Sequence, residues 1–194
     1  MKYLIVLTDG AAGRPVDEIG GKTALEAADM KCIDSFAARG EMGMVKTVPE
    51  GMAPGSDVAN LSVMGYAPEI YHTGRSPLEA ASMGIDMSPA DVSFRCNLIT
   101  VTGDGAYDDL TIKDHSSGDI SNEEAEELIW FIGENLSTDE IQFYPGVSYR
   151  HVMVVHGGST DYDLTPPHDV LEQRVGPNLP KGEGAEYLTE LMRK

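Results

Sequence analysis

An apolar run near the start of the chain constrains the fold more than any other feature. Residues 3–8 are predicted as a buried strand, because residues 4–7, with sequence LIVL, are apolar without alternation, which is typical of a strand covered on both faces in a parallel sheet. Residues 23–39 carry apolar side chains at helical spacing and end before Gly40. A second apolar stretch covers residues 42–48. Strand, helix and strand in this order predict a βαβ unit with parallel strands.

Polar residues follow both predicted strands. Asp9 and Gly10 come directly after the first strand, and the loop after the second strand leads to Ser56. Because ligands of open α/β sheets bind at the carboxyl ends of the strands, we expect Asp9 and Ser56 to lie at one edge of the sheet. Asp9 has two interpretations: a turn residue, or an oxygen ligand for a hard divalent cation.

Ser56 opens a predicted short helix. Val58, Leu61 and Met64 fall on one face of this helix at helical spacing. A helix N-terminus presents unpaired N–H groups and favours an anion. Ser56 therefore has two interpretations: a helix cap, or a nucleophile for a phosphoryl group if a metal or a base activates its hydroxyl.

The charge of the chain excludes some partners. The chain of 194 residues has 32 acidic and 14 Lys or Arg residues, for a net charge of −18, which argues against nucleic acid. A small phosphorylated substrate remains compatible if a few arginines or a metal supply local positive charge. No apolar run reaches membrane-spanning length. Cys32 and Cys96 form no CxxC pair, so a reduced, cytoplasmic compartment is expected.

The pattern changes after residue 88. Residues 92–99 alternate between apolar and polar, as in an antiparallel strand with one covered face, and residues 107–112 are predicted as its hairpin partner. Ser121 and Glu124 form a capping box ahead of an amphipathic helix. Strands are predicted at 141–143 and 149–155, and a last helix from about Glu183. The predicted domains are a core at 1–88, an α+β cap at 89–172 and a return segment at 173–194.

Several longer motifs carry a family resemblance. They are LIVLTDGAAGRP, APGSDVANLSVMGYAPEIYHTGRSPLEAASMGI, FRCNL, HSSGDIS, FYPGVSYRHVMVV, LTPPHD and LPKGEGAEYLTELM. With these motifs the chain resembles the archaeal-type, cofactor-independent phosphoglycerate mutases of the alkaline phosphatase superfamily. The resemblance implies an α/β fold: an alkaline-phosphatase-like parallel-sheet core, here partial, with an inserted α+β cap domain.

The resemblance also implies roles for individual residues. Asp9 matches a metal ligand, and Ser56 matches the residue that is both metal ligand and nucleophile. The implied reaction interconverts 3-phosphoglycerate and 2-phosphoglycerate through a phosphoserine. The residues that it suggests for substrate binding are Arg75, His115, Arg150, Arg95 and His151. Arg75 is equally compatible with a surface salt bridge, and His168 is interpreted as a linker residue.

Cofactor and partner expectations follow from the same resemblance. A divalent metal is expected, with Mn²⁺ first and Mg²⁺, Zn²⁺ or Co²⁺ as alternatives, and no 2,3-bisphosphoglycerate. Phosphoglycerate is the expected small-molecule partner, with a homo-oligomer as an option and neither nucleic acid nor membrane. The family's chains continue past residue 194, so little activity is expected of this chain alone. The alternatives are another phosphatase or phosphotransferase of the superfamily, and a non-catalytic assembly module.

Overall fold

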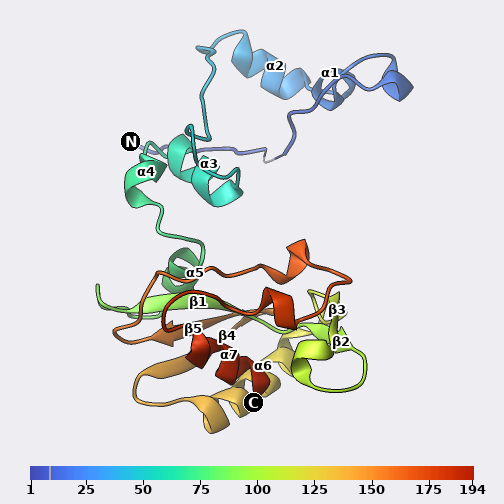
Figure 1. Ribbon diagram of the computed structural model, residues 1–194. Helices are drawn as coiled ribbons and strands as arrows, with labels where there is room; N and C mark the ends of the chain where they lie inside the picture. Colours follow the sequence, from blue (N-terminus) through green and yellow to red (C-terminus); the bar gives the residue numbers. More distant parts are fainter. Residues whose placement is uncertain (9) are drawn as a thin grey trace. The chain divides into compact units, whose positions relative to one another are not determined.

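The computed structural model describes residues 1–8 and 10–194. The chain divides into two compact units, Met1–His72 and Thr73–Lys194 (Figure 1). This division falls earlier than the boundary at residue 88 expected from the sequence, and the assignment of core and cap domains stays a prediction. Within the described residues, no helix has both the length and the apolar content needed to cross a bilayer.

The first unit consists of short helices joined by extended chain. In order they are the 3-10 helix η1 (Asp17–Ile19), α1 (Ala24–Ala27), α2 (Lys31–Ala37), α3 (Ser56–Val63) and α4 (Pro68–Tyr71). Local signals explain their starts. Thr23 and Glu26 form a reciprocal capping box at α1, and Pro68 opens α4, where its missing N–H costs nothing.

The strands predicted at residues 3–8 and 42–48 are wrong. Both segments lack strand structure, and their apolar side chains are exposed, with Leu4 at 87 % and Met44 at 100 %. A parallel strand pairs its N–H and C=O groups only with a neighbouring strand. The described part of this unit offers no such neighbour, so the predicted parallel sheet is not present in it.

The long helix predicted at 23–39 is interrupted. Ala28 is extended, with φ −76° and ψ 156°, and α2 begins three residues later at Lys31. The Asp29 carboxylate accepts hydrogen bonds from the backbone N–H of Lys31 at 3.4 Å and from its Nζ at 3.0 Å. Such local side-chain bonds compete with helical hydrogen bonding, which accounts for the break.

The second unit contains a three-stranded antiparallel sheet. Its strands are β1 (Val92–Asn97), β4 (Ile141–Val147) and β5 (Arg150–Val155), in the order β1-β5-β4. In the register, Cys96 faces His151 across the β1–β5 pair. The alternating pattern of residues 92–99 predicted this strand type correctly, because an antiparallel sheet covers its two faces differently.

Alternate residues of the central strand β5 fill two different cores. Val152 and Val154 pack with Ala80 of α5 (Ser76–Ser82). Met153 and Val155 pack with Phe94 and with Leu188 of α7 (Glu186–Arg193). Figure 1 accordingly shows α5 and α7 on opposite sides of the sheet, with α6 (Asn122–Leu136) against β4. The predicted capping box of Ser121 and Glu124 is present at the start of α6.

A second, two-stranded sheet holds the remaining strands. It pairs β2 (Thr100–Thr102) with β3 (Thr111–Asp114), so the predicted pairing of 107–112 with the first strand of this unit is wrong. The 3-10 helix η2 (Tyr107–Asp109) connects the two strands. Later chain runs beside β3: the Ile112 N–H donates to the Gln173 carbonyl at 2.9 Å.

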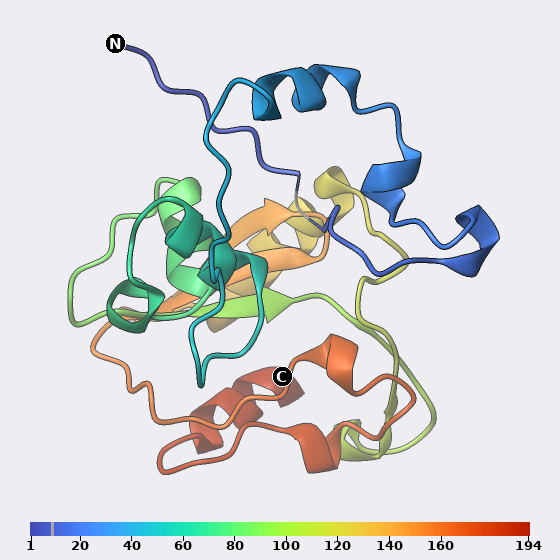
Figure 2. The same cartoon turned by 90° about the horizontal axis from the view of Figure 1, so that it is seen from above.

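The 3-10 helices η3 (Pro167–Asp169) and η4 (Gly176–Asn178) flank this later segment, and η4 lies against η2 (Figure 2). The buried residues here form one cluster of Ile112, Val170, Val175 and Leu179. This cluster fixes the end of β3 relative to η3.

Candidate functional site

Ser56 is the first residue of α3. The preceding residue, Gly55, is the N-cap and is extended, with φ −165° and ψ 152°. Because glycine has no side chain, this cap makes no side-chain hydrogen bond to the helix. Ser56 is therefore not the cap residue, although it lies at the helix N-terminus as predicted, and its residue is exposed. An exposed hydroxyl in the first turn of a helix lies where a negatively charged group is favoured.

Asp57 and His72 form a close pair in the same unit. His72 Nε2 lies 2.5 Å from Asp57 Oδ2, and their side chains are only 18 % and 13 % exposed. Asp57 is in the first turn of α3, and His72 is the C-cap of α4. The pair therefore joins the start of α3 to the end of α4, directly beside Ser56.

The predicted metal ligands are only partly described. Asp9 lies outside the described residues, so its position relative to Ser56 stays a prediction. Among the residues that the structure describes, no group of three or more His, Cys, Asp or Glu side chains is placed to hold a metal ion. The described residues therefore do not form a metal site by themselves.

Arg75 and Arg95 both contact α5 in the second unit, one through its backbone and the other through its side chain. Arg75 is the N-cap of α5, and its carbonyl accepts from the backbone N–H groups of Leu78 and Glu79 at 3.1 Å. Arg95 on β1 places Nε 3.2 Å from Glu79 Oε2. Arg95 thus has a carboxylate partner that ties α5 to the sheet. A role of either arginine in substrate binding stays a prediction.

His115, Tyr149 and Arg150 meet in the second unit, and His168 joins them. The ring centroids of His115 and Tyr149 are 5.6 Å apart, and those of His115 and His168 are 6.1 Å apart. The Arg150 guanidinium carbon lies 5.5 Å from the Tyr149 ring centroid. His115 follows β3, Tyr149 and Arg150 lie at the start of β5, and His168 belongs to η3. We call these four residues the His/Arg cluster.

His151 lies inside the sheet rather than at its surface. It is 1 % exposed, and its Nδ1 accepts a hydrogen bond from the backbone N–H of Gly146 at 3.0 Å. Burial lowers the pKa of His151 from 6.5 to about 4, although a backbone hydrogen bond at Ser148 acts in the opposite direction. The imidazole is therefore neutral near pH 7, and its expected contact with substrate stays a prediction.

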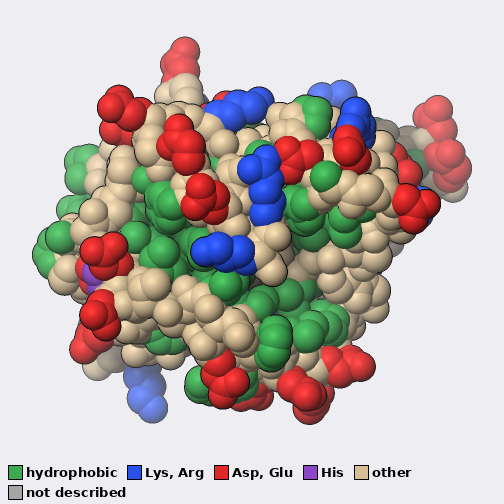
Figure 3. Space-filling view, turned by 60° about the horizontal axis from the view of Figure 1, so that its bottom comes forward, with side chains coloured by type: hydrophobic (Ala, Val, Ile, Leu, Met, Phe, Trp, Pro, Cys, Tyr) green, Lys and Arg blue, Asp and Glu red, His purple; other side chains and the backbone are tan. Residues whose placement is uncertain are grey.

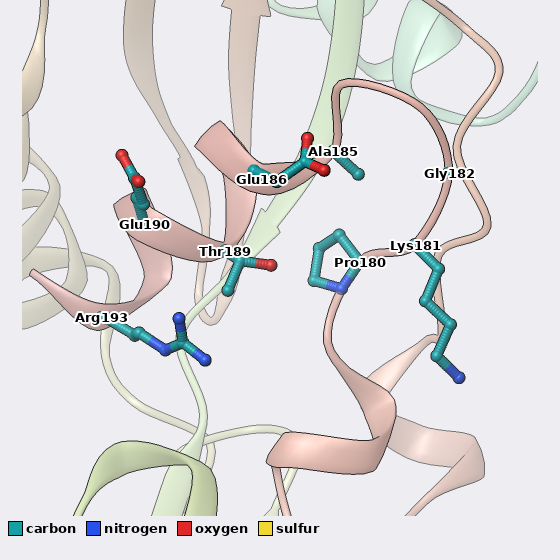
Figure 4. A pocket seen from close by; sticks show the side chains of 8 residues that line it. All are labelled: Pro180, Lys181, Gly182, Ala185, Glu186, Thr189, Glu190 and Arg193. Carbon is teal, nitrogen blue, oxygen red and sulfur yellow. The ribbon is translucent and has the colours of Figure 1, made fainter.

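Acidic side chains are spread over the surface shown in Figure 3, with few Lys or Arg among them. A pocket of about 380 Å³ lies between residues 180–182 and α7, and Figure 4 shows Lys181 and Arg193 at its ends. Arg193 is engaged by Asp108, with Nε 2.9 Å from Oδ1 and Nη2 2.6 Å from Oδ2. Of the predicted site residues that the structure describes, none lines this pocket.

The structure adds residues that sequence reasoning missed. Asp57 is adjacent to Ser56 in the chain, but its partner His72 is 15 residues away, and only the packing of α3 with α4 brings them together. His168 was interpreted as a linker residue, yet its ring faces that of His115. The Pro-Pro pair before His168 is the one local signal that the segment is stiff.

Comparisons with known proteins place the chain among mutases. Residues 37–194 match the family model described as 2,3-bisphosphoglycerate-independent phosphoglycerate mutase. A probable mutase of that description from Geobacter sulfurreducens is 52 % identical over 99 % of this chain and 48 % of its own length. The mutase of that description from Methanosarcina acetivorans is 48 % identical over 99 % of this chain and 47 % of its own length.

A solved structure of a Pyrococcus horikoshii protein has a TM-score of 0.64 and 26 % identity, and the match covers 94 % of this chain and 40 % of that one. The chain thus spans about half the length of the curated relatives it matches. The match to the family model covers most of the chain, including Ser56, both members of the Asp57–His72 pair and the whole His/Arg cluster. This chain belongs to the family of 2,3-bisphosphoglycerate-independent phosphoglycerate mutases.

Proposed function

We propose that this chain carries the nucleophile and part of the substrate site of an enzyme that interconverts 3-phosphoglycerate and 2-phosphoglycerate. The observation that carries the proposal is the exposed Ser56 in the first turn of α3, beside the Asp57–His72 pair, in a chain of this family. The helix N-terminus favours the negative charge that a phosphoryl group brings to this serine.

The reaction divides into two phosphoryl transfers. Ser56 Oγ attacks the phosphorus of 3-phosphoglycerate and loses its proton, the bond from phosphorus to the C3 oxygen breaks, and that oxygen takes up a proton. The products are phosphoserine and glycerate. After the glycerate turns, its C2 oxygen attacks the phosphorus of the phosphoserine and loses its proton. The bond from phosphorus to Ser56 Oγ breaks, Ser56 takes up a proton, and the product is 2-phosphoglycerate. The net result is an isomerisation, with no cofactor consumed.

Positioning and charge are the main requirements of such a transfer. The glycerate must stay bound while it turns, so donors for its carboxylate are needed in addition to the nucleophile. Among the residues suggested for this purpose, Arg150 and His115 lie together in the His/Arg cluster. Arg75, Arg95 and His151 complete the proposed set. The proposal also includes a divalent metal held by Asp9 and Ser56, with Mn²⁺ as the preferred ion. It places the enzyme in the cytoplasm.

Capture of the phosphoserine tests this function. The protein, isolated from its source cells with an antibody against this chain, is incubated with 3-phosphoglycerate and Mn²⁺ and digested for mass spectrometry. We expect one phosphoryl group on the peptide that contains Ser56. Ser56→Ala should abolish it. Ser62→Ala is the matched control, because Ser62 lies in the same helix and its Oγ donates to the Val58 carbonyl at 3.4 Å. An unphosphorylated Ser56 with full mutase activity would overturn the proposal.

A phosphatase of the same superfamily is the second candidate. The exposed Ser56 suits both reactions, because both begin with transfer of the phosphoryl group to a serine. The two differ in what happens to the glycerate: a phosphatase releases it, and water takes the phosphoryl group. Release of inorganic phosphate without 2-phosphoglycerate would therefore favour the phosphatase.

A further inference from the structure

The His/Arg cluster contains a cation without a carboxylate partner. Among the described residues, Arg150 forms no ion pair, whereas Arg95, Arg174 and Arg193 of the same unit each contact a carboxylate. This contrast is marked in a chain with 32 acidic residues and 14 Lys or Arg residues. The Arg150 residue is also exposed, and its guanidinium lies over the Tyr149 ring. Stacking on an aromatic ring leaves the N–H groups of an arginine available for an oxyanion.

The cluster also contains a buried polar atom without a partner. Among the described residues, His115 Nδ1 is buried and has no hydrogen-bond partner. A buried polar atom in this state is unfavourable unless a ligand or water satisfies it. His115 lies edge-on to Tyr149 at an interplanar angle of 88°, and the Arg150 guanidinium also contacts the Tyr149 ring, so Tyr149 links the two cationic or donor side chains.

The position of His168 is set by the same core that sets His115. Val170 is 7 % exposed and packs with Ile112, which is 4 % exposed. His168 is two residues before Val170, and His115 is three residues after Ile112. Pro166 and Pro167 restrict the backbone directly before His168, and the Asp169 N–H donates to the Pro166 carbonyl at 3.0 Å. The two histidines are therefore held near each other by buried contacts rather than by a flexible linker.

We propose that His168 is a substrate-binding residue, which joins His115, Tyr149 and Arg150 in one face that binds an oxyanion of a phosphorylated carboxylic acid. This inference rests on the proposed function and names a residue that the family resemblance did not suggest. Arg150 supplies the fixed positive charge and paired donors that suit a carboxylate or a phosphate. The imidazoles of His115 and His168 and the Tyr149 hydroxyl supply further donors.

Among the described residues, His168 has one carboxylate contact, with its chain neighbour Asp169. His168 Nε2 lies 3.5 Å from Asp169 Oδ1, with side chains 47 % and 62 % exposed. An exposed pair of neighbouring residues at this distance is weak. An oxyanion that contacts Arg150 and both histidines at once makes stronger, charge-assisted bonds and replaces this contact.

Ligand titration tests the inference. The histidine ring resonances of the protein are followed by NMR during addition of 3-phosphoglycerate, glycerate or inorganic phosphate. We expect the rings of His115 and His168 to shift with one common affinity. The titration in which the shifts saturate tells which oxyanion binds. Saturation with glycerate indicates that the carboxylate binds, and saturation with phosphate indicates that the phosphoryl group binds. His168→Gln should bind about tenfold more weakly, because one hydrogen bond to a charged ligand is lost. His156→Gln removes another histidine of the same unit outside the cluster and should bind normally.

The outcomes separate this inference from the proposed function. If Arg150→Gln weakens binding and His168→Gln binds as tightly as the unchanged protein, the role of His168 is overturned and the mutase proposal stands. If the ligand binds and His168→Gln weakens it, but Ser56 is never phosphorylated, the cluster is an oxyanion site and the mutase proposal fails. Absence of any shift at His168 with all three ligands overturns the inference directly.

Discussion

His72 Nε2 and Asp57 Oδ2 lie 2.5 Å apart and join the end of α4 to the first turn of α3, next to Ser56. Both side chains are mostly covered, so this contact is screened less by water than a surface ion pair would be. This contact holds Ser56, the proposed nucleophile, in place, since α3 cannot shift relative to α4 without breaking the contact.

Loss of this pair should loosen the start of α3. We expect His72→Ala to reduce the free energy of unfolding of the first unit by roughly 1–3 kcal/mol, because it removes a hydrogen bond between two partly buried side chains, one of them a carboxylate. Amide hydrogen exchange in residues 55–72 should speed up. Exchange in α6, which belongs to the second unit, is the internal reference. Unchanged exchange at α3 in this variant would show that the pair does not hold the helix.

The same variant should slow phosphorylation of Ser56 more than it weakens binding of 3-phosphoglycerate. The physical reason is that a misplaced nucleophile loses rate even when the ligand still binds. Single-turnover phosphoserine formation measures the rate, and NMR titration measures the affinity. His72→Asn keeps a donor and should recover part of the rate. Equal losses in rate and affinity would contradict a positioning role.

Protonation of His151 should couple stability to pH. Its pKa is about 4 in the folded protein and 6.5 as its ordinary value, so the unfolded chain binds the proton more tightly. Stability from this group is therefore complete above about pH 6.5 and falls as the pH drops toward 4. Between pH 7 and pH 5 we expect a loss of about 2 kcal/mol from this residue.

Urea unfolding at pH 7 and pH 5 measures this effect. Carboxylates also titrate at low pH, so the comparison is between the unchanged protein and His151→Gln, which has the same carboxylates. The variant should lose less stability than the unchanged protein over this interval. Equal losses in the two proteins would mean that His151 is protonated in the folded state at pH 5.

Two glycines of the second unit should respond oppositely to alanine. A Cβ at Gly146 would lie 2.2 Å from the Arg150 carbonyl oxygen, so the β4–β5 hairpin must shift, and with it the backbone donor to His151. We expect Gly146→Ala to cost about 1–3 kcal/mol or more. Gly133 lies inside α6, where a Cβ would meet only the Ser137 hydroxyl at 3.8 Å.

Gly133→Ala should therefore stabilise the protein by up to about 1 kcal/mol, because alanine has the higher helix propensity. Thermal or urea unfolding of both variants measures the sign of each change in stability. A neutral Gly146→Ala would show that the hairpin, and Arg150 with it, is free to move.

The two cysteines should differ in reactivity. Burial raises the pKa of the Cys96 thiol from 9.0 to about 11, whereas Cys32 is exposed. The thiolate is the reactive form, so an aromatic disulfide reagent at pH 8 should label Cys32 quickly and Cys96 only after unfolding. Cys32→Ser should remove the fast phase. A fast phase that persists in this variant would show that β1 opens readily.

Local sequence signals predicted the helices and strands that depend on neighbouring residues. The capping box of Ser121 and Glu124 begins α6 because both partners lie within one turn of chain. The alternation along residues 92–99 predicted β1, because its two faces meet different surroundings. The position of Ser56 at the start of a helix followed in the same way from Gly55 and the apolar spacing after it.

Contacts between distant residues were decided by the tertiary structure alone. The apolar residues 4–7 indicated a strand, yet a strand also needs a hydrogen-bonded neighbour, which no local pattern supplies. The meeting of His168 with His115 depends on the packing of Val170 against Ile112, 58 residues apart by sequence number. The sequence by itself determined where α3 and α6 begin and which residues bear reactive groups. Only packing between segments decided which of these groups face each other, because such contacts depend on the whole set of buried side chains.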